Sequence, residues 1–310
     1  MPEIDIKELR EALKDPIAAV EIAEKEYYEK VDDIATRVVN SHSIKVIFLS
    51  GPSGSGKTTT ANLIADRIKA LGEKSLVVSM DNFYRNSTDP SYPVLENGKR
   101  DYESPYALDI PELLSSLSKI IAGENFSIPR YDFKAGGRVE VTQYESFSDG
   151  CVIIEGIHGL NPIFSDPFPK ESVLKVFVSV STNINQGDYR IISGKKLRFL
   201  RRMVRDNIYR GASADATVAM WANVLDGEEK YLYPYKYTAD IMFDSFHIFE
   251  PAVLKPFAVK LLGPKLISES PFVKTVADAL EKLPELSQDL VPETSLIREF
   301  IPGGIYEDLY

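Results

Sequence analysis

Short apolar runs alternate with segments of helical spacing over most of the chain. The apolar runs are rich in β-branched residues and have the length of buried strands; they cover residues 44–50, 75–79, 151–157 and 174–180. Segments 58–71 and 109–123 repeat apolar residues at intervals of three and four, and both stop at a glycine, Gly72 and Gly123. Strands that alternate with helices predict an α/β fold, with a doubly wound, mostly parallel sheet and flanking helices.

The pattern changes at both ends of the chain, which predicts three parts. Residues 1–42 form a helical arm in which Asp15 caps a helix that begins at Pro16. Its apolar positions are Ile17, Val20, Ala23, Tyr27, Val31, Ile34 and Val38, and its charged face is Glu21, Glu24, Lys25, Glu29 and Lys30. We expect that charged face to be solvated, with partner binding as the alternative. Residues 43–262 form the main domain, and residues 263–310 form a tail that packs on the core and carries no catalytic residue.

Two segments of the main domain depart from simple strand and helix alternation. Residues 126–143 predict a β-excursion broken by Gly136 and Gly137, with aromatic side chains that belong either to the core or to a substrate wall. Residues 213–262 predict a helix, a tyrosine-rich loop, two short strands and a helix after Pro251.

A glycine-rich loop between the first strand and the first central helix fits the pattern G-x-x-x-x-G-K-[ST] at Gly51, Gly56, Lys57 and Thr58. Glycines with positive φ let consecutive backbone N–H groups approach a polyphosphate at the positive end of a helix. Lys57 adds a point charge near the β and γ phosphates. We expect the phosphates to contact Gly51, Ser53, Gly54, Ser55, Gly56, Lys57, Thr58 and Thr59. A chance turn rich in glycine and serine is the alternative.

Two acidic residues lie at the ends of predicted strands. Asp81 follows the strand 75–79, at the sheet edge where α/β folds place their ligands, and a helix cap or turn is its alternative role. Glu155 lies within the apolar run 151–157, where a carboxylate without a function is rare. Carboxylate and hydroxyl oxygens suit Mg²⁺, so Thr58, Asp81 and Glu155 are the predicted metal ligands.

Residues 195–210 predict a cationic helix with an apolar stripe. Its arginines are Arg198, Arg201, Arg202, Arg205 and Arg210. Nucleic-acid binding is one interpretation. With a phosphate loop in the same chain, we favour an arginine-bearing lid over about residues 182–212, because guanidinium groups match phosphoryl oxygens.

Composition narrows the choice of partner. The net charge of −10 disfavours non-specific binding to nucleic acid or anionic lipid. The single cysteine, Cys151, lies in an apolar run and is expected to be a buried hydrophobe in a reducing compartment. The sequence has neither a long apolar stretch nor a leader-like start, so it predicts a soluble, cytoplasmic protein without a membrane partner. It leaves open whether the chain forms a homo-oligomer.

Several motifs in sequence order resemble the uridine kinase and phosphoribulokinase family of P-loop kinases. They are GPSGSGKTTT, MDNFYR, DYESPYALD, IPRYDFKAGGR, VIIEGIHGL and RRMVRDNIYRG, which together span about residues 44–211. The later WANVLDGEEKYLYPYKYTADIMFDS and PETSLIREFIPGG resemble a bacterial branch of nucleoside kinases.

The resemblance implies a role for individual residues. Asp81 would be the base for the substrate hydroxyl, with Lys57, Arg202 and Arg205 as the other catalytic residues and Arg210 on the nucleotide. Glu155 would lie near the metal, and Glu103 would hold sugar hydroxyls. The expected substrate contacts are Asp81, Tyr84, Arg85, Glu103, Tyr131, Phe133 and Arg138.

The chain departs from the family at two positions that contact the base in pyrimidine nucleoside kinases. Gly136 stands where relatives have a histidine, and Ala212 stands where they have an arginine. The resemblance therefore predicts an ATP- and Mg²⁺-dependent kinase that acts on a hydroxyl of a small molecule, foremost a nucleoside. A kinase for another hydroxylated metabolite, such as a sugar phosphate, is the alternative among enzymes. Two alternatives lie outside the enzymes. A GTP-driven switch would need an N/T-K-x-D motif, which the sequence does not contain. An RNA-binding regulator that uses residues 195–210 stays open.

Overall fold

A parallel sheet forms the centre of the computed structural model, which describes residues 2–95, 98–133 and 135–309. Its strands are β3 (Lys74–Ser79), β6 (Gly150–Glu155), β2 (Val46–Ser50), β7 (Val173–Ser179) and β10 (Ile241–Asp244), in that spatial order. In the register, Val46 lies opposite Val152 on one side and Val173 on the other. The predicted α/β fold with a mostly parallel sheet is confirmed. Of the two short strands expected within 213–262, the described residues form one, β10.

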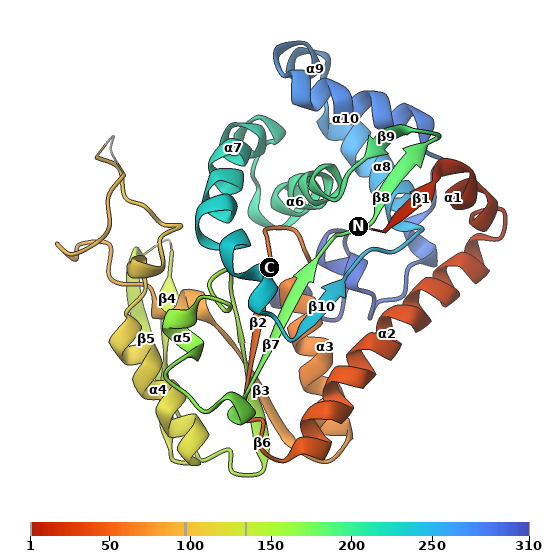
Figure 1. The fold of residues 1–310 in the computed structure, drawn as a ribbon. Coiled ribbons are helices and arrows are strands. Elements are labelled where there is room, and N and C mark those ends of the chain that lie inside the picture. The colour runs from red at the N-terminus through yellow and green to blue at the C-terminus, as the bar shows by residue number, and fades with distance from the viewer. Residues whose placement is uncertain (1, 96–97, 134, 310) are drawn as a thin grey trace.

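Helices cover both faces of this sheet (Figure 1). The central strand β2 is buried at every position because its side chains alternate between two cores. Ile47 and Leu49 pack with α2 (Pro16–Ser41) and α3 (Lys57–Ala70), whereas Val46 and Phe48 pack with α4 (Ile110–Ala122). The hairpin of β4 (Phe126–Asp132) and β5 (Gly137–Tyr144) lies beside α4 and forms the predicted β-excursion.

The N-terminal arm adds a strand that the sequence did not indicate. β1 (Glu3–Asp5) pairs in parallel with β8 (Asn183–Gln186), which forms an antiparallel hairpin with β9 (Tyr189–Ile192). α1 (Ile6–Ala12) follows β1, and α2 begins at Pro16 with Asp15 as its cap, as predicted.

Two positions of α2 correct the expected helical faces. Ile17, assigned to the apolar stripe, is 57% exposed. Glu24, assigned to the solvated face, is only 6% exposed because the C-terminal segment covers it and the Ser295 hydroxyl donates a hydrogen bond to its carboxylate. The end of the chain therefore packs against α2 as well as against the sheet.

A second core lies beyond the carboxyl edge of the sheet and is built from helices. It contains α6 (Gly194–Arg210), α7 (Ala214–Tyr231), α8 (Glu250–Leu261), α9 (Pro264–Glu269) and α10 (Pro271–Lys282), together with residues of α1, β8 and β9. The short helix α5 (Pro162–Ser165) follows β6. In this second core, apolar residues of the tail such as Val276 and Phe300 pack together with residues of α6.

The basic helix α6 buries two of the arginines that the sequence assigned to its cationic face. Arg201 is fully buried in an ion pair with Glu250, and Arg198 is 2% exposed and pairs with Glu228. Within the described ranges, no helix is long and apolar enough to cross a lipid bilayer.

Candidate active site

The glycine-rich loop joins β2 to α3, and three of its glycines meet different steric demands. Gly54 and Gly56 have φ of 72° and 86°, in the left-handed region that favours glycine. Gly51 was expected to need a positive φ as well, and this expectation is wrong. It is a glycine because a Cβ there would lie 2.0 Å from the Val178 carbonyl oxygen. The loop is therefore held tightly against β7 where it leads into α3.

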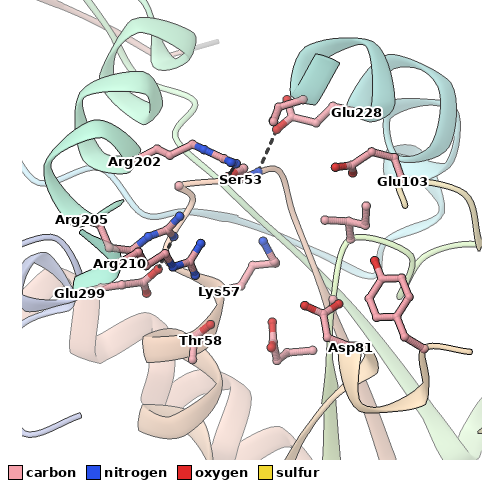
Figure 2. A pocket seen from close by; sticks show the side chains of 17 residues that line it. Ser53, Lys57, Thr58, Asp81, Glu103, Arg202, Arg205, Arg210, Glu228 and Glu299 are labelled. Atoms are coloured by element: carbon pink, nitrogen blue, oxygen red, sulfur yellow. Dashed lines mark hydrogen bonds and ion pairs between the residues drawn. The ribbon is translucent and has the colours of Figure 1, made fainter. Parts of the chain in front are cut away.

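A cavity of about 230 Å³ opens over this loop. Twelve residues predicted for the site line it: Ser53, Gly54, Gly56, Lys57, Thr58, Asp81, Tyr84, Glu103, Glu155, Arg202, Arg205 and Arg210. Arginines of α6 lie on one wall, Asp81 and Glu103 lie on the opposite wall, and Lys57 points into the space between them (Figure 2). The pocket thus places cations opposite a carboxylate that faces open space.

Asp81 lies in a 3-10 turn (Met80–Phe83) directly after β3. The cap of this turn is Ser79, whose hydroxyl accepts from the Asp81 N–H, so the side chain of Asp81 is not needed as the cap. Its carboxylate is accessible from the pocket. Desolvation at the pocket wall raises the pKa of Asp81, while Lys57 and Arg210 lower it. Asp81 is therefore placed to hold or accept a proton at the pocket wall.

Glu155 and Thr58 supply oxygen atoms to the floor of the same pocket. Glu155 is the last residue of β6, and its burial raises its pKa to about 7, against the opposing effect of Lys57. A carboxylate that is costly to ionise in the protein alone gains from a nearby cation. The donor set of Thr58, Asp81 and Glu155 therefore fits a hard divalent ion such as Mg²⁺. Among the described residues, no cluster of three or more His, Cys, Asp or Glu side chains forms a ready metal site.

Lys57 begins α3, and its ammonium group donates to the Pro52 carbonyl oxygen at 3.2 Å. Burial lowers the pKa of Lys57, and the charge of Glu155 opposes that shift. The Lys57 side chain therefore contacts the glycine-rich loop that precedes it in the chain.

Three arginines of α6 converge on one acid that the sequence analysis did not single out. Asp206 contacts Arg202 at 3.2 Å, Arg205 at 2.8 Å and Arg210 at 3.4 Å. Arg202 also donates to the Ser53 hydroxyl at 2.7 Å. Asp206 therefore holds these guanidinium groups together beside the loop. The predicted lid covers residues 182–212, and none of the pocket residues comes from its first part, 182–193. Within the lid, only α6 borders the cavity.

Two further acids in the pocket were missed by the sequence analysis. Glu228 of α7 accepts a hydrogen bond from the Ser53 N–H at 2.8 Å and pairs with Arg198. Glu299 comes from the tail, which was expected to contribute nothing catalytic, yet it lines the cavity and is 4% exposed. Both acids interrupt apolar patterns, and that was the available signal. Glu228 follows buried Val224 by one helical turn, and Glu299 lies between Ile297 and Phe300.

Glu103 lines the pocket on the side of α7. Burial raises its pKa, and Arg202 opposes this shift. A Cβ at Gly227 would lie 2.9 Å from the Glu103 Cγ, so α7 approaches this segment closely only because it has a glycine there.

The remaining predicted substrate residues lie outside the cavity lining. Tyr131 and Phe133 form an aromatic cluster with Tyr84, with ring centroids 5.7 and 5.5 Å from that of Tyr84. Arg85 bonds the Leu108 carbonyl, and Arg138 pairs with Asp109 and with Glu112. Tyr84 of the pocket therefore contacts an aromatic cluster outside the cavity, and the structure does not bring Arg85 or Arg138 to the loop. Ser55, Gly51 and Thr59 belong to the loop and to α3 without lining the cavity.

Comparison with known proteins identifies the architecture around this pocket. The Phosphoribulokinase / Uridine kinase family matches residues 46–249, from β2 to the residue before α8. The chain belongs to the phosphoribulokinase/uridine kinase family. The family resemblance expected from the motifs is thereby confirmed, and the chain is a small-molecule kinase.

Individual relatives in the family match most of their own length. The "Uridine kinase" of Lactobacillus johnsonii is 30% identical over 198 residues, which are 64% of this chain and 84% of that protein. The "Uridine kinase" of Deinococcus deserti is 27% identical over 209 residues, which are 67% of this chain and 91% of that protein. A solved D-glycerate 3-kinase from Cryptococcus neoformans has a TM-score of 0.45 and 16% identity, and covers 66% of this chain and 88% of that one. The family match stops before the segment that contributes Glu299.

Proposed function

We propose that this member of the family transfers the γ-phosphoryl group of ATP, with Mg²⁺, to a hydroxyl of a small molecule, foremost a nucleoside. The observation that carries the proposal is the pocket in which Lys57 and the N-terminus of α3 face Asp81 across open space. Phosphoryl transfer needs this combination because catalysis depends on positioning the two substrates and on neutralising charge.

The residues on each wall take separate parts in this reaction. The loop N–H groups and Lys57 hold the phosphates of the donor, and Arg202 and Arg205 stabilise negative charge on the transferring group. Asp81 accepts the proton of the acceptor hydroxyl as its oxygen bonds to phosphorus and the bond from phosphorus to the leaving ADP oxygen breaks. Thr58 and Glu155, with Asp81, would hold Mg²⁺, which when bound neutralises phosphate charge and fixes its geometry.

Acceptor recognition rests on the wall opposite the arginines. In this proposal Glu103, which lines the cavity, accepts hydrogen bonds from sugar hydroxyls, and Tyr84 contacts the aromatic cluster of Tyr131 and Phe133. Ala212 and Gly136 offer no polar side chain for a nucleobase, and neither lines the pocket. We therefore propose that contacts to the sugar dominate, and that uridine and cytidine are poorly distinguished. A sugar phosphate is the second candidate acceptor on the same grounds.

The RNA-binding alternative loses its main support in the arrangement of α6. Arg198 and Arg201 are buried in ion pairs and cannot reach a nucleic-acid backbone. The proposal includes a cytoplasmic location, which the single cysteine favours, and it leaves the homo-oligomer as an alternative to a monomer.

The test is a panel of nucleosides and sugar phosphates, assayed for ATP consumption together with the mass of the product. We expect one acceptor class to gain a single phosphoryl group, and we expect Lys57→Ala to abolish this gain. ATP consumption that is the same with and without every acceptor, or a product without added phosphate, would contradict the proposal.

The structure also decides which variant tests base recognition. A histidine at Gly136 would be strained because φ is 66° and a Cβ there would lie 2.9 Å from the Ser87 hydroxyl oxygen. Ala212 follows the end of α6 without a positive φ, so Ala212→Arg is the sounder variant. We expect it to raise kcat/KM for uridine or cytidine by about tenfold, the effect of about 1.4 kcal/mol, with sugar phosphates as the control. Sharp discrimination of uridine in the wild type would contradict the proposal that sugar contacts dominate.

A further inference from the structure

The C-terminal segment places a carboxylate on the phosphate-binding end of α3. Glu299 accepts hydrogen bonds from the Thr59 N–H at 3.3 Å and from the Thr59 hydroxyl at 2.9 Å. Thr59 is the third residue of α3, so its N–H is among those that a helix leaves without an intrahelical acceptor. These N–H groups are the ones that bind phosphate at the end of a glycine-rich loop.

Glu299 also contacts an arginine that the proposed reaction uses. Its carboxylate lies 3.8 Å from the Arg205 guanidinium, and both side chains line the cavity (Figure 2). A bound donor phosphate would use the same two kinds of partner, a helix N-terminal N–H and an arginine. Glu299 therefore satisfies, within the protein, the groups that a phosphate would otherwise satisfy.

The segment that carries Glu299 is anchored from several directions. Leu296 packs on the loop so closely that a Cβ at Gly56 would lie 2.4 Å from its Cδ1. The Tyr28 hydroxyl donates to the Thr294 carbonyl at 2.9 Å, and the Tyr209 hydroxyl donates to the Ile301 carbonyl at 2.9 Å. Glu299 is thus fixed on the loop by α2 on one side and α6 on the other.

The size of the cavity points the same way. Small-molecule sites are about 300–1,000 Å³, and this cavity of about 230 Å³ must admit both a donor and an acceptor. Displacement of a lining side chain such as Glu299 would enlarge the cavity for both substrates. Glu299 also repels the donor by its charge. The donor phosphate and the Glu299 carboxylate would be two anions at the same end of α3.

We propose that Glu299 determines the affinity of the enzyme for its phosphoryl donor, by occupying the Thr59 end of the phosphate site and repelling the donor until its side chain leaves Thr59. This inference rests on the proposed function for the identity of the donor. It does not rest on the identity of the acceptor.

The test compares Glu299→Gln with wild type by calorimetric titration of MgATP and of inorganic pyrophosphate, without acceptor. Glutamine keeps an oxygen for the Thr59 N–H and removes the charge. We expect the Kd of both ligands to fall by about tenfold, as a gain of about 1.4 kcal/mol gives. The matched control is Glu293→Gln, which removes an exposed acid of the same tail outside the pocket and should leave both Kd values unchanged.

Unchanged or weaker binding in Glu299→Gln would overturn the inference, as would an equal gain in Glu293→Gln. A second measurement on the wild type covers the case in which the variant does not fold. Pyrophosphate should speed amide hydrogen exchange in residues 294–301, and slower exchange there would also overturn it. Neither measurement needs turnover, so a chain that binds ATP but phosphorylates no acceptor would contradict the proposed function and not this inference.

Discussion

At the scale of single residues, burial and neighbouring charges shift the pKa values of Lys57, Asp81 and Glu155 in opposite directions. Asp81 and Glu155 are pushed toward the neutral form by burial and toward the ionised form by Lys57. Lys57 is pushed toward its neutral form by the same burial and is held charged by Glu155. The groups therefore depend on one another, and a change of charge at one alters the protonation of the rest.

Asp81 provides the sharpest test of a catalytic residue. Asp81→Asn should keep ATP binding within a few-fold and lower kcat by about 10²-fold or more, because asparagine cannot accept the proton of the acceptor hydroxyl. Single-turnover kinetics with the best acceptor, alongside the Kd for ATP, would measure the two effects separately. A kcat close to that of the wild type would return Asp81 to the role of a turn residue.

The site residues that could be predicted from the sequence are those that belong to a local pattern. The loop from Gly51 to Thr58 has a fixed spacing, and Asp81 and Glu155 stand at ends of strands, so topology alone brings them to one edge of the sheet. Glu228 and Glu299 reach the loop through packing of distant segments, which no local pattern specifies. Each left one weaker sign, an acid within an apolar pattern, which is the argument that identified Glu155.

At the scale of elements, α2 and α6 have inner faces that contain charged residues. The cap and the spacing of α2 predicted its start, but which charged residue would be covered depended on the C-terminal segment. For α6 the arginines were assigned to one cationic face, and acids on α7 and α8 draw Arg198 and Arg201 inward. The three-residue strand β1 was too short for a periodic signal, and its partner β8 lies 180 residues further along the chain (Glu3 opposite Asn183).

Burial of Glu24 makes the contact between α2 and the tail sensitive to pH. Burial raises the pKa of Glu24 from 4.5 to about 7. The folded protein therefore holds this proton more tightly than the unfolded chain between those values, so the Glu24 contribution to the free energy of unfolding falls as the pH rises through this window. Glu24→Gln should remove that contribution and raise the free energy of unfolding at pH 8 by up to about 3 kcal/mol.

The measurement is urea unfolding of both proteins at pH 5 and pH 8. Glu26→Gln, an exposed position on the same helix, is the control and should leave the pH dependence as it is. An equal stability difference between Glu24→Gln and wild type at the two pH values would contradict the assignment.

At the scale of the whole molecule, a buried ion pair joins the sheet to the helical core. Arg201 of α6 pairs with Glu250 of α8, and it also donates to the Gly54 carbonyl and to the Ser245 carbonyl. One side chain thus links the phosphate loop, the end of β10 and two helices. These contacts give buried polar groups hydrogen-bond partners in the interior.

Loss of one member of this pair should be costly. Glu250→Gln leaves the Arg201 charge buried without a counter-ion and should lower the free energy of unfolding by about 3 kcal/mol or more. Asp278→Asn breaks an exposed pair with Lys274 and should lower it by less than about 1 kcal/mol. Chemical denaturation of both variants measures the difference, and equal effects would mean that the buried pair contributes no more than a surface pair.

The contacts of residues 295–299 with the phosphate-binding helix α3 and with α2 have a consequence for synthesis on the ribosome. Glu299 contacts Thr59 across 240 positions of sequence, and Ser295 contacts Glu24 across 271. A nascent chain can form the sheet and the glycine-rich loop, but this side of the pocket stays open to solvent until residues 295–299 have left the exit tunnel. The nucleotide site therefore waits for a segment that is synthesised 240 residues after the loop itself.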